Sequence, residues 1–187
     1  MGVAWSKSIP CFLAMMLGAC GGAAQSVEQG QTPRQVSDGL DLSLRRHDGD
    51  VIELRDQRGA PVLLFFFATY DDASTASANG VARFAREALD TVVIAVALQP
   101  DAPVFAAAYV ETEQPPYAVA YDPDNHILMG QSELGTFEAV PMFVMIDARG
   151  REIVRHVGYA SERQMRGWRE EALSAGGIDQ ELGAASR

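Results

Sequence analysis

The chain has 187 residues, of which 48% are hydrophobic and 21% charged, and its formal net charge is −10. These proportions are ordinary for a soluble globular protein, and they exclude wholesale disorder and a multi-span membrane protein. The acidic balance also argues against nucleic acid as a partner, because phosphate contacts need clustered arginine or lysine. We therefore expect one domain with a substantial core.

The first residues predict a secretory leader. Lys7 supplies a positive charge, and the apolar segment from Ile9 to Ala19 is too short to span a bilayer. The segment ends in Leu-Gly-Ala-Cys at Cys20, which resembles the lipobox of bacterial lipoproteins. That resemblance implies a signal peptide over residues 1–19, a lipidated Cys20, and a domain held by its lipid on the periplasmic side of a bacterial cell envelope. The alternative is an ordinary signal peptide followed by a chance cysteine.

The composition then changes to Gly, Ala, Gln, Ser, Thr and Pro, which predicts a flexible tether over residues 20–37. The domain is expected over residues 38–176, and the polar, small residues 177–187 predict a disordered tail. The chain's two cysteines are Cys11, inside the leader, and Cys20. The mature protein would therefore have no free thiol and no internal disulfide.

The first half of the domain predicts a hairpin followed by a βαβ unit. Residues 40–44 and 51–54 alternate as strands do, and an Asp-Gly turn lies between them. The unbroken apolar run 62–68 predicts a strand buried on both faces. Helical spacing over 72–89 and the apolar run 91–98 complete the unit, which makes the two buried strands parallel.

The second half predicts shorter elements. We expect a helix over 103–110, a strand over 117–121, a helix capped near Asp122 that ends at Gly130, a closing hairpin over 140–147 and 153–157, and a helix over 161–175.

Two stretches of the sequence resemble the TlpA-type branch of the thioredoxin superfamily. The run Ala-Thr-Tyr-Asp-Asp-Ala-Ser over residues 68–74 is similar to the Ala-Thr-Trp-Cys-x-x-Cys of that family's active site, and Val-Pro-Met-Phe-Val-Met-Ile-Asp over 140–147 is similar to its Val-Pro-Thr-x-Phe-Leu-Ile-Asp. The resemblance spans about residues 40–173. It implies an α/β thioredoxin-like fold, with a central mixed β-sheet flanked by helices, an N-terminal β-hairpin, and a cis Pro141 facing the motif.

Both cysteines of the motif are replaced, by Asp71 and Ser74. The resemblance therefore implies a degenerate site with no catalytic residue, beside a binding groove formed by Tyr70, Asp71, Asp72, Ala139, Val140 and Pro141. Asp71 has an independent interpretation from its residue type, because aspartate is a preferred helix N-cap. A paired acid site, in which Asp71 and Asp72 act as general base or metal ligands, is the alternative.

No cofactor or metal is expected. The three histidines, His47, His126 and His156, are far apart in the sequence and show no metal-ligand spacing. The sequence thus favours a redox-inactive, lipid-anchored module that binds an envelope protein or peptide. The competing functions are a thiol-disulfide oxidoreductase, as the family implies, or a non-thiol activity at Asp71 and Asp72.

Overall fold

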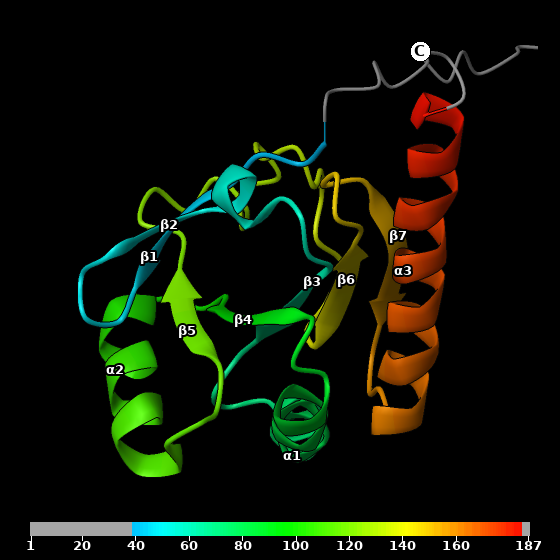
Figure 1. Ribbon diagram of the computed structural model, residues 1–187. Helices are drawn as coiled ribbons and strands as arrows, with labels where there is room; N and C mark the ends of the chain where they lie inside the picture. Colours follow the sequence, from blue (N-terminus) through cyan, green and yellow to red (C-terminus); the bar gives the residue numbers. More distant parts are fainter. Residues whose placement is uncertain (1–38, 185–187) are drawn as a thin grey trace, which may run out of the picture. The chain divides into compact units, whose positions relative to one another are not determined.

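A computed structural model describes residues 39–184 of the chain. Within this range seven strands form one mixed sheet in the order β2-β1-β5-β4-β3-β6-β7 (Figure 1). The strands are β1 (Ser43–Arg46), β2 (Val51–Glu53), β3 (Val62–Phe67), β4 (Val92–Ala97), β5 (Ala118–Tyr121), β6 (Met142–Ile146) and β7 (Glu152–Val157). The predicted leader, the lipidation site and the tether lie outside the described residues.

The central strand β3 is buried along its whole length, as its sequence predicts. It pairs in parallel with β4 and antiparallel with β6, so that Phe66 lies opposite both Val96 and Met142. Its side chains alternate between two apolar clusters, with Phe65 in one and Leu64 in the other. The predicted βαβ unit and the burial of its strand on both faces are therefore confirmed.

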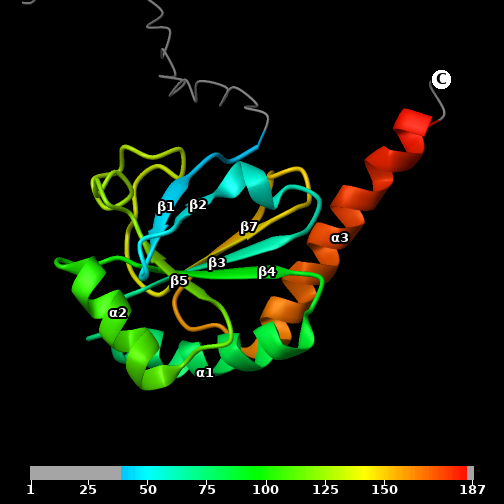
Figure 2. The same cartoon turned by 60° about the vertical axis from the view of Figure 1, so that its left-hand side comes forward.

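Helices cover one face of this sheet. They are α1 (Asp72–Glu87), α2 (Ala102–Glu113) and α3 (Glu162–Ala184) (Figures 1 and 2). Phe84 of α1, Ala106 of α2 and Met165 of α3 all belong to the apolar cluster that contains Phe65. None of the helices in the described range is both long enough and apolar enough to cross a bilayer.

The other face is covered by irregular chain and one 3-10 turn. Leu40 and Leu42 precede β1, Leu54 begins the turn η1 (Leu54–Gln57), and Ile127 and Leu134 come from the connection between β5 and β6. These residues are all buried against the second cluster. The expected architecture, a mixed sheet flanked by helices with an N-terminal hairpin, is confirmed, with the hairpin strands beginning at Ser43 rather than Leu40.

The helix predicted from Asp122 to Gly130 is wrong, because this segment forms successive turns. The Asp122 carboxylate accepts hydrogen bonds from the backbone N–H of Asp124 (3.1 Å) and of Ile127 (2.7 Å). Asn125 and Gly130 have positive φ angles of 56° and 68°, which a continuous right-handed helix excludes. An aspartate that was expected to cap a helix therefore closes a loop instead.

The last helix is longer than predicted, since α3 continues to Ala184 instead of ending near Ala175. Gly176 and Gly177 indicated an end, but each glycine costs a helix only about 1 kcal/mol relative to alanine. The residues that follow include Gln180, Glu181 and Leu182, which favour helix. Residues 177–184, predicted as tail, thus have a helical backbone.

Candidate functional site

Asp71 caps the helix that follows the central strand. Its backbone is extended (φ −96°, ψ 121°), and its carboxylate accepts a hydrogen bond of 2.6 Å from the backbone N–H of Ser74. The Asp71 carbonyl accepts two more, from the backbone N–H and the hydroxyl of Thr75 (3.0 and 3.1 Å). The predicted N-cap is confirmed, and one oxygen of this carboxylate is engaged in holding the first turn of α1.

Ser74, at the second degenerate position, is buried with 1% of its surface exposed. Its hydroxyl accepts a long hydrogen bond of 3.4 Å from the backbone N–H of Ala68 at the end of β3. Asp72 is the first residue of α1, and its side chain is exposed. The two acids of the motif therefore differ, because only Asp71 has a structural partner among the described residues.

Gln99 fixes the backbone at Thr69, near the start of the motif, a role that the sequence did not reveal. This buried side chain follows β4, and its oxygen accepts from the Thr69 backbone N–H (2.6 Å) and the Thr69 hydroxyl (3.1 Å). In the sequence, a polar residue after an apolar strand indicates only a loop. The partner of Gln99 is known only once β3 and β4 are paired in parallel, because that pairing brings Thr69 next to it.

The strand register brings three segments to one edge of the sheet. Met142, the first residue of β6, lies opposite Phe66 of β3 and opposite Val157 of β7. The peptide bond before Pro141 is cis, as the resemblance implied, and the Pro141 carbonyl accepts from the Gly158 N–H at 2.8 Å. Residues 70–72, 139–141 and 157–159 therefore leave the sheet together.

Several apolar side chains at this edge are exposed. The exposed fractions are 73% for Tyr70, 55% for Tyr159 and 45% for Val157. Ala139 is also exposed, Val140 is half-buried, and Pro141 is buried. We call the surface formed by Tyr70, Ala139, Val140, Val157 and Tyr159 the motif edge. Val157 and Tyr159 could not be predicted from the sequence, because their position depends on the pairing of β7 with β6.

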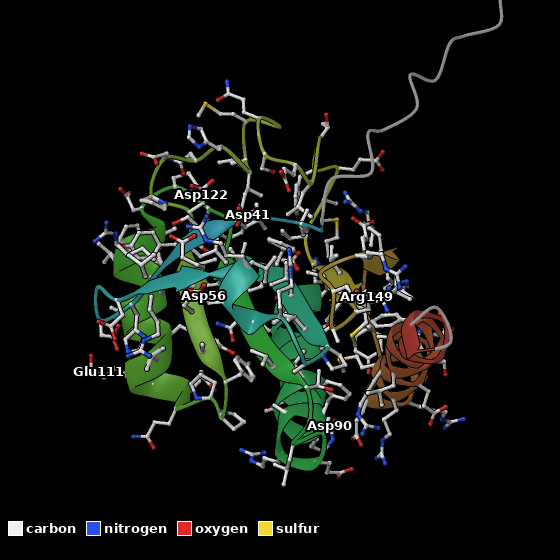
Figure 3. All side chains as sticks on the ribbon, turned by 45° about the horizontal axis from the view of Figure 1, so that its top comes forward. Asp41, Asp56, Asp90, Glu111, Asp122 and Arg149 are labelled. Carbon is white, nitrogen blue, oxygen red and sulfur yellow. The ribbon has the colours of Figure 1, made fainter. Side chains whose placement is uncertain are left out.

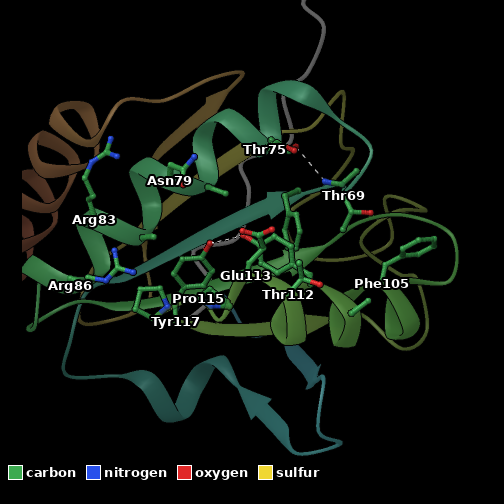
Figure 4. A pocket seen from close by; sticks show the side chains of 18 residues that line it. Thr69, Thr75, Asn79, Arg83, Arg86, Phe105, Thr112, Glu113, Pro115 and Tyr117 are labelled. Atoms are coloured by element: carbon green, nitrogen blue, oxygen red, sulfur yellow. Dashed lines mark hydrogen bonds between the residues drawn. The ribbon is translucent and has the colours of Figure 1, made fainter.

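A cavity of about 500 Å³ lies between α1 and α2, next to the motif. Thr69 and Ser74 line one part of it, and Figure 4 shows Arg83 and Arg86 on the α1 side with Glu113 on the α2 side. This cavity was not predicted from the sequence. Its only sequence signal is the small side chains on the facing sides of two helices, which cannot be read without knowing that the helices are neighbours.

Two half-buried tyrosines form a polar contact in the cavity wall. The hydroxyls of Tyr109 and Tyr117 are 3.0 Å apart, and the Tyr109 ring packs on Phe67 with the ring centroids 4.9 Å apart. Burial raises the pKa of the Tyr117 phenol far above its ordinary value, and the neighbouring Tyr109 and Glu113 raise it further. Burial likewise raises the pKa of Tyr109. Both phenols are therefore neutral at physiological pH.

No group of three or more His, Cys, Asp or Glu side chains within residues 39–176 is arranged to hold a metal ion. Asp71 and Asp72 are thus not joined by a third such ligand in this part of the chain. The motif consists of the capped start of α1 and the buried Ser74 hydroxyl, and it lies beside the exposed apolar side chains of the motif edge.

Comparisons with known proteins identify the family. Solved structures with the same fold include the exposed lipoprotein thioredoxin Etrx1 of Streptococcus pneumoniae (24% identity, 70% of this chain and 98% of that chain, TM-score 0.59). A thiol:disulfide interchange protein of Chlorobium tepidum has 19% identity and a TM-score of 0.61, and the match covers 72% of this chain and 94% of that chain. A secreted disulfide oxidoreductase of Mycobacterium tuberculosis has 15% identity and a TM-score of 0.57, and the match covers 69% of this chain and 94% of that chain. No curated protein matches. The Redoxin family model matches residues 25–171, and the chain therefore belongs to the Redoxin family.

Proposed function

We propose that this protein is a redox-inactive thioredoxin-like module that binds an apolar polypeptide segment at the motif edge. The observation that carries the proposal is the occupation of both catalytic positions, by Asp71 as a helix cap and by Ser74 as a buried hydroxyl. Thiol-disulfide exchange requires a thiolate as the attacking group. The sequence has no cysteine between residue 21 and its end.

The exposed side chains of the motif edge support binding as the remaining activity. Tyr70, Val157 and Tyr159 present apolar surface from two separate segments at one edge of the sheet. Tyrosine supplies a large contact area at low conformational-entropy cost, which is why it is common in protein interfaces. An extended polypeptide with apolar side chains matches this surface.

The family supports the competing function, a thiol-disulfide oxidoreductase, and an insulin-reduction assay separates the two. We expect the purified protein to reduce insulin no faster than the buffer with the same reductant. Measurable turnover, after thiol contaminants are removed and Cys11 and Cys20 are replaced by serine, would contradict the proposal.

Binding at the motif edge can be tested with a reduced and alkylated, permanently unfolded polypeptide, followed by fluorescence anisotropy. We expect Tyr70→Ser to weaken binding by about tenfold, the effect of losing one buried aromatic contact. Leu89→Ser is the matched control, because Leu89 is 88% exposed and lies beyond the other end of α1. Equal affinity of the two variants would exclude the motif edge as the binding surface.

We further propose that Cys20 is lipidated and anchors the domain outside the cytoplasm. The lipobox supports this, and the structures of the same fold include an exposed lipoprotein and a secreted protein. Intact mass should show a diacylated cysteine as the first residue, and Cys20→Ser should move the protein from the membrane to the soluble fraction. An unmodified Cys20 in the native protein would refute the anchor.

A further inference from the structure

We propose that the cavity between α1 and α2 binds a free α-amino acid with an apolar side chain. Its volume of about 500 Å³ falls within the ~300–1,000 Å³ typical of small-molecule sites. This site goes beyond polypeptide binding at the motif edge, because none of the motif-edge residues lines the cavity.

The cavity interior suits an apolar side chain. Ala78 and Ala82 of α1 face Ala108 of α2 across the cavity, so their short side chains leave space between the two helices. The neighbouring rings of Phe67 and Tyr109, tilted by 50° to each other, supply an aromatic surface. A ligand's aliphatic or aromatic side chain would be removed from water here.

Two opposite charges line the cavity from opposite helices. Arg86 lies in the last turn of α1 and Glu113 is the last residue of α2, and both act electrostatically on the Tyr117 phenol. Arg83, the other cavity arginine, is already paired with Glu162 at 2.9 Å. Within the described residues, neither Arg86 nor Glu113 forms an ion pair with the other or with a third group.

This charge pattern selects among ligand classes. An α-amino acid carries an ammonium and a carboxylate on one carbon, so it can pair with Glu113 and Arg86 at the same time. A fatty acid or a phosphate ester would satisfy Arg86 but would bring its own negative charge close to Glu113. A simple amine would have the reverse problem with Arg86.

The first test is calorimetric titration of the purified full-length chain with L-phenylalanine. We expect saturable one-to-one binding with a Kd at or below about 1 mM. N-acetyl-L-phenylalanine and L-phenylalaninamide each lack one charge and should bind at least about tenfold more weakly. Absence of phenylalanine binding, equal binding of either analogue, or tighter binding of a phenylalanine dipeptide would overturn the assignment.

Variants locate the binding in the cavity. Arg86→Gln, Glu113→Gln and the cavity-filling Ala82→Leu should each weaken phenylalanine binding at least about tenfold. Their matched controls are Arg163→Gln, Glu111→Gln and Ala76→Leu, which change exposed helix residues outside the cavity and should bind as the native chain does. Figure 3 shows Glu111 projecting outward from α2. Native affinity in all three cavity variants would place the binding elsewhere and refute the proposal.

Discussion

At the scale of single residues, Asp71 places a carboxylate at the start of α1, where the similar motif has a cysteine thiol. Unpaired N–H groups and the helix dipole favour negative charge at this position, the effect that lowers the pKa of a cysteine there. The Asp71 carboxylate uses the same environment, through its 2.6 Å hydrogen bond from the Ser74 N–H. The position therefore has an acceptor for the N–H groups at the helix start and has no nucleophilic thiol.

Removal of the Asp71 cap should destabilise the protein. Asp71→Ala should lower the free energy of unfolding by about 0.5–2 kcal/mol, and Asp71→Asn should cost less because it keeps an acceptor oxygen. Urea denaturation followed by circular dichroism measures both. Asp72→Ala is the control, since the Asp72 side chain is exposed in the same turn. A cost for Asp72→Ala as large as that for Asp71→Ala would contradict the capping role.

At the scale of elements, α1 and α3 are held together by a small packing contact and by ion pairs. A Cβ atom at Gly80 would lie 3.4 Å from the end of the Met165 side chain, about van der Waals contact distance, so Gly80 marks where the two helices meet. Around this contact Glu162 accepts from Arg83 at 2.9 Å and also from Arg166. The hydrogen bond from Arg83, followed by that from Arg166, lowers the pKa of Glu162 below its ordinary 4.5.

The sign of this shift predicts a pH dependence. Because the folded-state pKa of Glu162 is depressed, its stabilisation is present above the unfolded pKa and disappears as the pH falls through the folded one. Glu162→Gln should therefore destabilise the protein more at about pH 6 than at about pH 3. Thermal melts at both pH values, with the exposed Glu171→Gln as control, measure this. A gap that persists unchanged at the lower pH would exclude the ionised pair as its cause.

At the scale of the whole molecule, the family's scaffold is present while its reactive groups are absent. The parallel pairing of β3 with β4 and the capped start of α1 place the two degenerate positions directly after the central strand. If this environment is inherited, restoring the thiols should restore the chemistry. A cysteine at position 71 would meet the helix N-terminus that favours its thiolate.

We expect the double variant Asp71→Cys with Ser74→Cys to form an internal disulfide and to reduce insulin, in a background where Cys11 and Cys20 are serine. Single Asp71→Cys in the same background is the control, because it has no second thiol to complete the cycle. Mass spectrometry after alkylation reports the disulfide, and the insulin assay reports turnover. A folded double variant that keeps two free thiols under oxidising conditions would refute the inherited geometry.

The sequence by itself determined the elements whose signals are local. The apolar run of β3, the helical spacing of α1 and the Asp-Gly turn of the first hairpin depend on residues a few positions apart, and all three predictions are confirmed. The N-cap at Asp71 is equally local, since donor and acceptor are three residues apart. For Asp122 a local signal was not sufficient, because the same side chain that caps helices also closes turns.

Only the tertiary structure decided which distant residues share a site. Gln99 is 30 residues from Thr69, and Val157 reaches the motif edge only through the pairing of β7 with β6. The cavity likewise needs α1 and α2 to lie side by side with Arg86 and Glu113 on opposite walls. Contacts of this kind depend on strand register and helix packing, which are properties of the whole chain and leave no periodic pattern in any short stretch of it.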